Sequence, residues 1–156
     1  MTGVMGTFAV KFVVSHPLQP ERQAELEGLV DSGALFTQIP EQILATIGIT
    51  PSGNRAVYDA DGTGAVVPVA KADISIHGIE TATMVLCGRP KSLVLLGATT
   101  LETLGFGVDS IHKKLIPTSI ARIPDAGEAP ESGQRMLRVQ PERQAALHAA
   151  GTADAR

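Results

Sequence analysis

Most of the sequence between residues 8 and 96 consists of short apolar segments that are rich in β-branched residues and are separated by turn-forming residues. Segments of this kind are typical of strands in a sheet that is buried on at least one face. Tight turns are expected at residues 61–64 and at His77-Gly78, where glycine allows the chain to reverse. The sequence therefore predicts a mainly β fold. We expect strands at residues 8–14, 24–30, 55–59, 66–69, 72–76, 81–86 and 92–96.

Two short helices are expected within this β pattern. The first spans residues 40–47, with Pro40 in its first turn and Gly48 after its end. The second spans residues 99–104 and is followed by Gly105. Proline near the start and glycine past the end are typical helix boundaries. An apolar strand and a turn of small residues precede each helix, which indicates an internal pseudo-repeat within one small domain.

The composition changes near the C-terminal end of the chain. A length of 156 residues fits one ordinary domain, but the last part is rich in Ala, Glu, Arg, Gln, Pro and Gly. Because such a segment buries little apolar surface, we predict a folded domain over residues 1–120 and a flexible tail over residues 121–156, with a short helix near residues 141–149. The hexapeptide at residues 19–24 recurs at residues 140–145, and we have no physical account of this repeat.

Composition and charge argue against several classes of function. Aromatic residues make up 3% of the chain, tryptophan is absent, and the formal net charge is -3. This composition provides neither the base-stacking surface nor the basic patch of a nucleic-acid-binding protein. No apolar run reaches the roughly 18 residues that a membrane helix needs, and the first residues lack the pattern of a secretion signal. We therefore expect a cytoplasmic protein with no nucleic-acid partner and no membrane partner.

The cysteine and the histidines give no sign of a metal or cofactor site. Cys87 is the single cysteine, so the chain forms no internal disulfide, and the apolar residues around it predict a buried structural thiol. The four histidines, His16, His77, His112 and His148, lack the spacing of metal ligands. We expect no cofactor and no bound metal.

A candidate catalytic residue lies in the segment Leu29-Val30-Asp31-Ser32-Gly33-Ala34. Here an acidic residue follows two apolar residues at the point where a buried strand ends in a tight turn. Gly33 permits a close backbone approach that a side chain would block, and Ser32 can fix the turn by a hydrogen bond. An Asx-type turn that merely ends the strand is the alternative interpretation of Asp-Ser-Gly.

Three further segments accompany this turn. Residues 40–49 begin with Pro-Glu and end in Ile-Gly-Ile, Leu95-Leu96-Gly97-Ala98 precedes the second helix, and two short strands are expected within residues 108–117. In this order and spacing, residues 7–117 resemble the retropepsin-like (retroviral-type) aspartic peptidase family, in particular its small bacterial and archaeal members.

The resemblance implies a retropepsin-like closed β-barrel, or half-pepsin fold, with one or two short helices. It implies that Asp31 is the catalytic carboxylate. Peptide hydrolysis of this kind uses two carboxylates that share a proton. Because the chain carries one such motif, the second carboxylate is Asp31 of another copy, which implies a homodimer that cleaves extended peptide or protein substrates. Two sets of residues would support the site: Ser32, Gly33 and Ala34 in the active-site loop, and Leu96, Gly97 and Ala98 in the second motif.

The hairpin around residues 58–67 corresponds to the flap of the family, which closes over an extended peptide and excludes water. An ordinary solvent-exposed hairpin is an equally good interpretation. A calcium site is a poor one, because Asp59 and Asp61 lack the remaining ligands of an EF-type loop. The expected flap residues are Asp59, Ala60, Asp61, Gly62, Thr63 and Gly64. Four apolar residues are expected to line side-chain pockets: Leu35, Val66, Val67 and Ile116.

The chain departs from the family pattern at two places. Many family members carry a polar or charged residue directly after the second-motif glycine, where this chain has Ala98 and Thr99, so we expect the dimer to be braced differently. Ala34 stands where many pepsin-like sites have a hydroxyl that stabilises the ionised carboxylate, and its absence predicts activity at mildly acidic to neutral pH. The alternative to an enzyme is a non-catalytic dimerisation or peptide-binding module that keeps the fold.

Overall fold

The computed structural model describes residues 7–118 of the chain. These residues belong to Met1–Ser119, the first of two units into which the chain divides. The predicted tail over residues 121–156, its short helix and the second copy of the hexapeptide lie outside the described residues.

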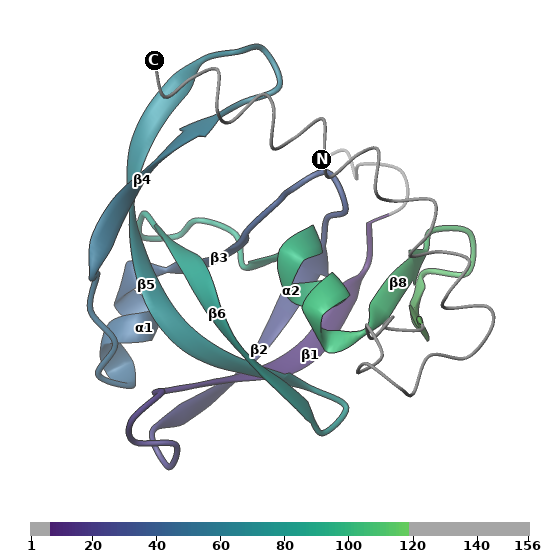
Figure 1. The fold of residues 1–156 in the computed structure, drawn as a ribbon, viewed down its shortest axis with the longest axis horizontal. Helices are drawn as coiled ribbons and strands as arrows, with labels where there is room; N and C mark the ends of the chain where they lie inside the picture. The colour runs from purple at the N-terminus through teal and green to yellow at the C-terminus, as the bar shows by residue number, and fades with distance from the viewer. Residues whose placement is uncertain (1–6, 119–156) are drawn as a thin grey trace, which may run out of the picture. The chain divides into compact units, whose positions relative to one another are not determined.

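Strands dominate the described part of the chain, and two short helices interrupt them (Figure 1). This confirms the prediction of a mainly β fold with two short helices. In chain order the elements are β1 (Ala9–Ser15), β2 (Gln23–Val30), β3 (Thr37–Pro40), α1 (Glu41–Thr46), β4 (Gly53–Tyr58), β5 (Gly64–Ile76), β6 (Ile79–Gly88), β7 (Leu95–Leu96), α2 (Ala98–Leu104), β8 (Phe106–Asp109) and β9 (Lys114–Pro117).

Seven strands form one mixed sheet in the order β1-β2-β7-β3-β6-β5-β4, while β8 and β9 form a separate two-stranded sheet. Pairing is parallel between β2 and β7 and between β3 and β6, and antiparallel elsewhere. β1 also pairs with β5, so the sheet curls back toward its first strand. The predicted closed barrel is nevertheless wrong. Its wall is not continuous, because β7 has only two residues and meets β3 at the single pair Gln38 and Leu95.

The core of this unit is mainly aliphatic, as the low aromatic content predicts, and Phe12 and Phe106 are its buried aromatic members. It lies between the curled sheet and the two helices, and each fully buried large aliphatic side chain contributes roughly 1.5–3 kcal/mol through its removal from water. The largest side chains with less than 2% of their surface exposed include Ile39, Leu44, Ile74, Ile76, Leu96 and Leu101.

Several predicted boundaries differ from the structure. Residues 66–69 and 72–76 belong to one strand, β5, which pairs with β4 near its start and with β1 near its end. The strand predicted at 92–96 shrinks to β7, and a turn with Lys91 at a φ of 66° precedes it. β3 was not predicted. Its last residue, Pro40, precedes a helix that begins one residue later than predicted.

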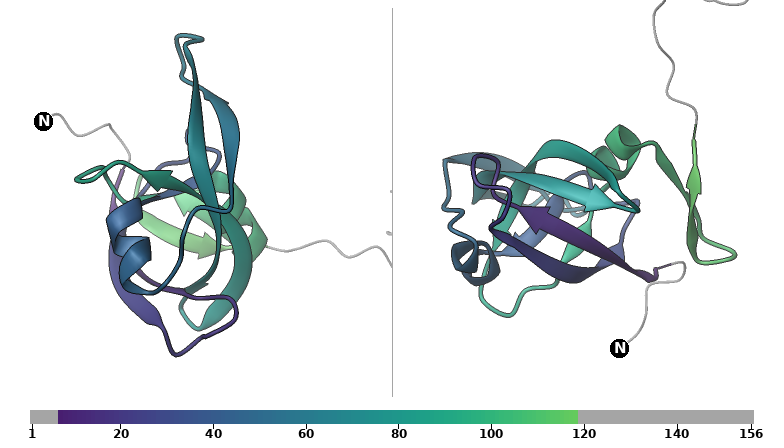
Figure 2. Two further views of the ribbon diagram at one scale, coloured as in Figure 1. Left: turned by 90° about the vertical axis from the view of Figure 1, so that its left-hand side faces the viewer. Right: turned by 90° about the horizontal axis from the view of Figure 1, so that it is seen from below.

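The hairpin formed by β4 and β5 projects from the rest of this unit (Figure 2). Its strands pair from Gly53 and Val69 outward to Tyr58 and Gly64. The outer part of β5 has β4 as its only neighbour in the sheet, so no strand pairing ties this end of the hairpin to the core. The predicted flap therefore has the geometry of a projecting arm.

Candidate active site

Asp31 directly follows the C-terminal end of β2, which lies against the parallel strand β7. The Asp31 N–H donates to the carbonyl oxygen of Leu96 at 3.1 Å. Leu96 is fully buried, so a core residue of the second motif fixes the backbone on which the candidate carboxylate stands. Asp31 itself is only half-buried.

The residues after Asp31 form a tight turn. The Gly33 N–H donates to Asp31 Oδ1 at 3.0 Å, and the Ala34 N–H donates to the Asp31 carbonyl oxygen at 3.1 Å. This is the Asx-type turn of the alternative interpretation. It holds one carboxylate oxygen in place, and no hydrogen bond from the described residues reaches the other, Oδ2. The turn therefore orients Asp31 and leaves it able to accept a proton or a water molecule.

The second motif lies directly against the loop that follows Asp31. A Cβ atom added to Gly97 would lie 2.5 Å from the carbonyl oxygen of Phe36, so only glycine fits between the two backbones. The Ala98 N–H donates to the Ala34 carbonyl at 2.8 Å, and the Thr99 N–H donates to the Leu35 carbonyl at 3.0 Å. The structure thus brings residues 96–98 and 31–34 together.

A buried pair of hydroxyls joins the same two segments. Thr37 Oγ1 and Thr100 Oγ1 are 2.7 Å apart, and the Gly97 N–H donates to Thr37 Oγ1 at 3.1 Å. Both threonines are at most 1% exposed. Sequence reasoning missed this pair, because nothing in the sequence links two threonines that are 63 residues apart.

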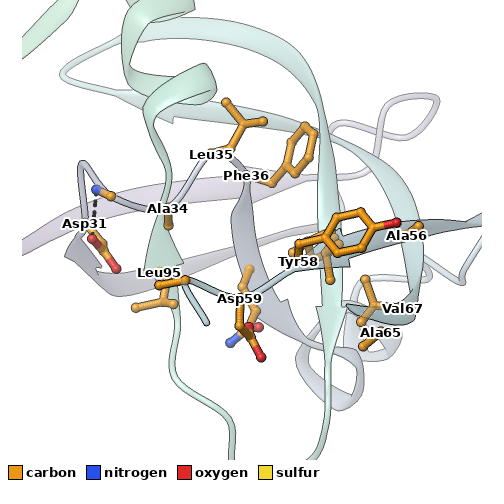
Figure 3. A pocket seen from close by; sticks show the side chains of 15 residues that line it. Asp31, Ala34, Leu35, Phe36, Ala56, Tyr58, Asp59, Ala65, Val67 and Leu95 are labelled. Carbon is orange, nitrogen blue, oxygen red and sulfur yellow. Dashed lines mark hydrogen bonds between the residues drawn. The ribbon is translucent and has the colours of Figure 1, made fainter. Parts of the chain in front are cut away.

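A cavity of about 640 Å³ lies between the Asp31 turn and the β4–β5 hairpin (Figure 3). Of the predicted flap residues, Asp59 and Ala60 line it, whereas residues 61–64 do not. Of the four predicted pocket residues, Leu35 and Val67 line it, whereas Val66 and Ile116 do not. The outer half of the hairpin and the start of its loop, residues 56–60, therefore border the cavity together with the candidate carboxylate.

One side-chain contact links the hairpin to the loop after Asp31. The Arg55 guanidinium on β4 lies 5.7 Å from the centre of the Phe36 ring. A cation over an aromatic face is attracted by the ring's negative potential. This contact fixes the base of the hairpin beside the cavity.

The hairpin tip is closed by its own hydrogen bonds. The Thr63 N–H donates to Asp61 Oδ1 at 2.8 Å, and this bond is the main cause that holds the pKa of Asp61 below its usual value. Gly62 has a φ of 86°, and its N–H donates to the Asp59 carbonyl at 2.9 Å. The Asp61 carboxylate therefore stabilises the turn at the hairpin tip.

Ser32 lies on another side of the same turn. It is exposed and lines a second cavity of about 290 Å³ together with Ala98, Glu102 and Val108. The predicted role of Ser32, a contact with the equivalent loop of a second copy, stays a prediction.

The remaining candidates take no part in this site. Cys87 is buried, as predicted, and burial, followed by the charge of Glu41, raises the pKa of its thiol. Within residues 7–118, no three His, Cys, Asp or Glu side chains are grouped so as to hold a metal ion. In the same range, no helix has the length and apolar character needed to cross a membrane. The cytoplasmic location stays a prediction.

Comparison of the chain with models of protein families finds no matching family. Comparison with curated proteins finds no match either.

Proposed function

We propose that this protein is a homodimeric aspartic endopeptidase of the retropepsin-like type, with one active site built from two copies of Asp31. The observation that carries the proposal is the half-buried Asp31 carboxylate, which an Asx turn orients at the edge of the 640 Å³ cavity. The retropepsin-like fold belongs to the same proposal. It is supported by the second motif, which packs against the Asp31 loop through Gly97.

The other carboxylate at this cavity is a poor partner for Asp31 within one chain. Asp59 lies in the loop of the projecting hairpin, and no hydrogen bond or ion pair of the described residues holds its side chain. A catalytic pair needs a fixed geometry, because small displacements of reacting groups lower the rate strongly. A second copy of Asp31, held by the same turn, meets this requirement.

In the proposed reaction, two adjacent Asp31 carboxyl groups share one proton, since two charges about 3 Å apart cannot both persist. The ionised group takes a proton from a water molecule, and the water oxygen bonds to the substrate carbonyl carbon. The protonated group donates to the carbonyl oxygen. The C–N bond then breaks, the nitrogen leaves with a proton from the carboxyl pair, and the products are a carboxylic acid and an amine.

Asp31→Asn tests the proposal with little change in structure, because the asparagine side-chain oxygen can still accept from the Gly33 N–H. We expect the parent protein to cleave members of a peptide library and the variant to lose at least about 1,000-fold in rate, as is typical when a reacting group is removed. Circular dichroism and thermal unfolding serve as the folding control. Cleavage by both proteins would contradict the proposal. Peptide binding without cleavage by the parent would favour the non-catalytic module.

A further inference from the structure

The cavity beside Asp31 has an unbalanced charge. Its lining contains two carboxylates, Asp31 and Asp59, and no lysine, arginine or histidine. The basic side chain on the adjacent strand, Arg55, is engaged with the Phe36 ring. Within residues 7–118, no lysine or arginine forms an ion pair, and the Asp109–His112 contact lies on the β8–β9 hairpin, away from this cavity. No basic side chain of the described residues therefore lines this cavity, although the charge of Arg55 lies beside it over the Phe36 ring.

The two acidic side chains of the hairpin loop differ in what they bind. The Asp61 carboxylate accepts the Thr63 N–H and closes the turn. The backbone of Asp59 takes part in the same turn, since its N–H donates to the Thr63 carbonyl and its own carbonyl accepts the Gly62 N–H. Asp59 is exposed in this open arrangement, its carboxylate has no hydrogen-bond partner within the described chain, and it lines the cavity (Figure 3).

The walls next to Asp59 suit the stem of a long side chain. Val57, Val67 and Ala65 of the hairpin and Leu95 of β7 line the cavity. Tyr58 also lines it, with its ring against the backbone of Gly64 and 74% of its surface exposed. Lysine and arginine bury a hydrocarbon stem along such surfaces and keep the charged end beside an acidic group or an aromatic ring.

We propose that Asp59 is a specificity-determining residue that selects peptides with a lysine or arginine side chain beside the scissile bond. The inference rests on the proposed function and names its substrate class. When the hairpin closes on a peptide, water leaves the cavity, and a carboxylate without a partner becomes costly. A substrate with a basic side chain pairs with the Asp59 carboxylate and removes that cost. A substrate with a neutral side chain leaves the carboxylate unpaired, and a substrate with an acidic side chain adds repulsion.

The chain offers a matched pair of variants for the test. Asp59→Asn removes the unpartnered carboxylate, and Asp61→Asn removes the same charge two residues away while its side-chain oxygen can still accept from Thr63. The substrates are decapeptides of one parent sequence in which lysine, norleucine or glutamate occupies each position in turn. Norleucine has a stem similar to that of lysine and no charge, so the ratio of the two kcat/KM values isolates the contribution of the charge.

For the parent and for Asp61→Asn, we expect lysine to exceed norleucine by about tenfold at one or two positions, the effect of one partly desolvated charge pair. For Asp59→Asn, we expect a ratio near one, with cleavage of the norleucine peptide retained. An unchanged ratio in Asp59→Asn, or no lysine preference in the parent, would overturn the inference.

Peptide binding separates failure of this inference from failure of the proposed function. Fluorescence anisotropy with labelled lysine and norleucine decapeptides measures binding to Asp31→Asn and to Asp31→Asn/Asp59→Asn. Absence of cleavage by the parent would overturn the peptidase proposal, whereas a lysine preference in binding that needs Asp59 would still support the role of Asp59. Equal binding of the lysine and norleucine peptides to Asp31→Asn would overturn the proposed role of Asp59.

Discussion

At Gly97 two backbone segments approach so closely that the space for a side chain disappears. The Cβ of any other residue would lie 2.5 Å from the Phe36 carbonyl oxygen and 2.8 Å from the Thr37 nitrogen. Both are backbone atoms, which cannot turn aside as the end of a flexible side chain can. The hydrogen bonds that Ala98 and Thr99 donate to the Asp31 loop depend on this approach. The shape of the candidate site therefore depends on the absence of a Cβ methyl group at position 97.

We expect Gly97→Ala to lower the free energy of unfolding by about 1–3 kcal/mol, the usual cost of overpacking. Gly53→Ala is the control, because its Cβ would have Val69 Cγ2 at 3.7 Å as its nearest neighbour, and we expect a change within about 0.5 kcal/mol. Denaturant unfolding measures both values. Equal effects of the two substitutions would show that the close approach at Gly97 does not exist in solution.

The site residues that could be predicted from the sequence are those that contact their neighbours along the chain. Asp31, Gly33 and Ala34 form a turn within four residues, and turn chemistry is readable from adjacent residues. The contribution of Thr37 and Thr100 was not predictable in this way, because their contact depends on how strands β2, β3 and β7 assemble. Asp59 was expected in the flap, but its place at the cavity depends on the direction in which the hairpin projects.

Among the elements, the β4–β5 hairpin is the part of the site with the fewest attachments. Its base is tied to the Asp31 loop by Arg55 and Phe36, while its outer residues pair only with each other. Large parts of the hairpin are exposed, including Val66 at 71%. In the proposed peptidase, an arm that is tied at its base alone would open for a peptide and close over it without disturbing the core.

Loss of the Arg55 charge should loosen this arm. We expect Arg55→Met, which keeps an apolar stem but removes the cation, to increase amide hydrogen exchange in β4 by about two- to fivefold, as follows from a cation–π contribution of about 0.5–1 kcal/mol. Arg89→Met, in the exposed turn after β6, is the control and should leave β4 unchanged. The same increase with both variants would mean that the Phe36 contact does not hold the hairpin.

Element types were predicted better than element ends. Alternating apolar residues at 24–30 in β2 and at 72–76 in β5 indicate a strand without reference to the rest of the fold. Gly48 and Gly105 follow the two helices with a φ of 78° and 83°. The two-residue β7 and the four-residue β3 are too short to carry such a pattern. They become strands because of their neighbours, since β7 lies between β2 and β3 and β3 pairs with β6.

For the molecule as a whole, the mainly β character followed from composition and periodicity, whereas the closed barrel did not form. Whether a sheet closes depends on the length and register of every strand in it, and β7 is too short to complete the wall. A site shared between two copies is also a property of the whole assembly, so it needs a test at that scale.

Mixing the parent with Asp31→Asn supplies this test. If each site needs Asp31 from both chains, an equimolar mixture that exchanges subunits contains about one quarter parent dimers. We therefore expect about a quarter of the activity of the same total amount of parent protein. A loss of only one half would mean that each chain works by itself. Sedimentation that shows monomer alone at high concentration would likewise contradict the shared site.

The bond network around Gly97 also sets when a newly made chain can acquire its site. The loop after Asp31 takes its shape from residues that lie about 60 positions later, through the hydroxyl pair and the hydrogen bond from the Gly97 N–H. Contacts of such separation form only after the intervening chain has been synthesised and closed into a loop. A nascent chain that still lacks α2 would carry Asp31 on an unfixed turn. In the proposed peptidase, activity would therefore begin only after α2 has been synthesised and has docked against the Asp31 loop.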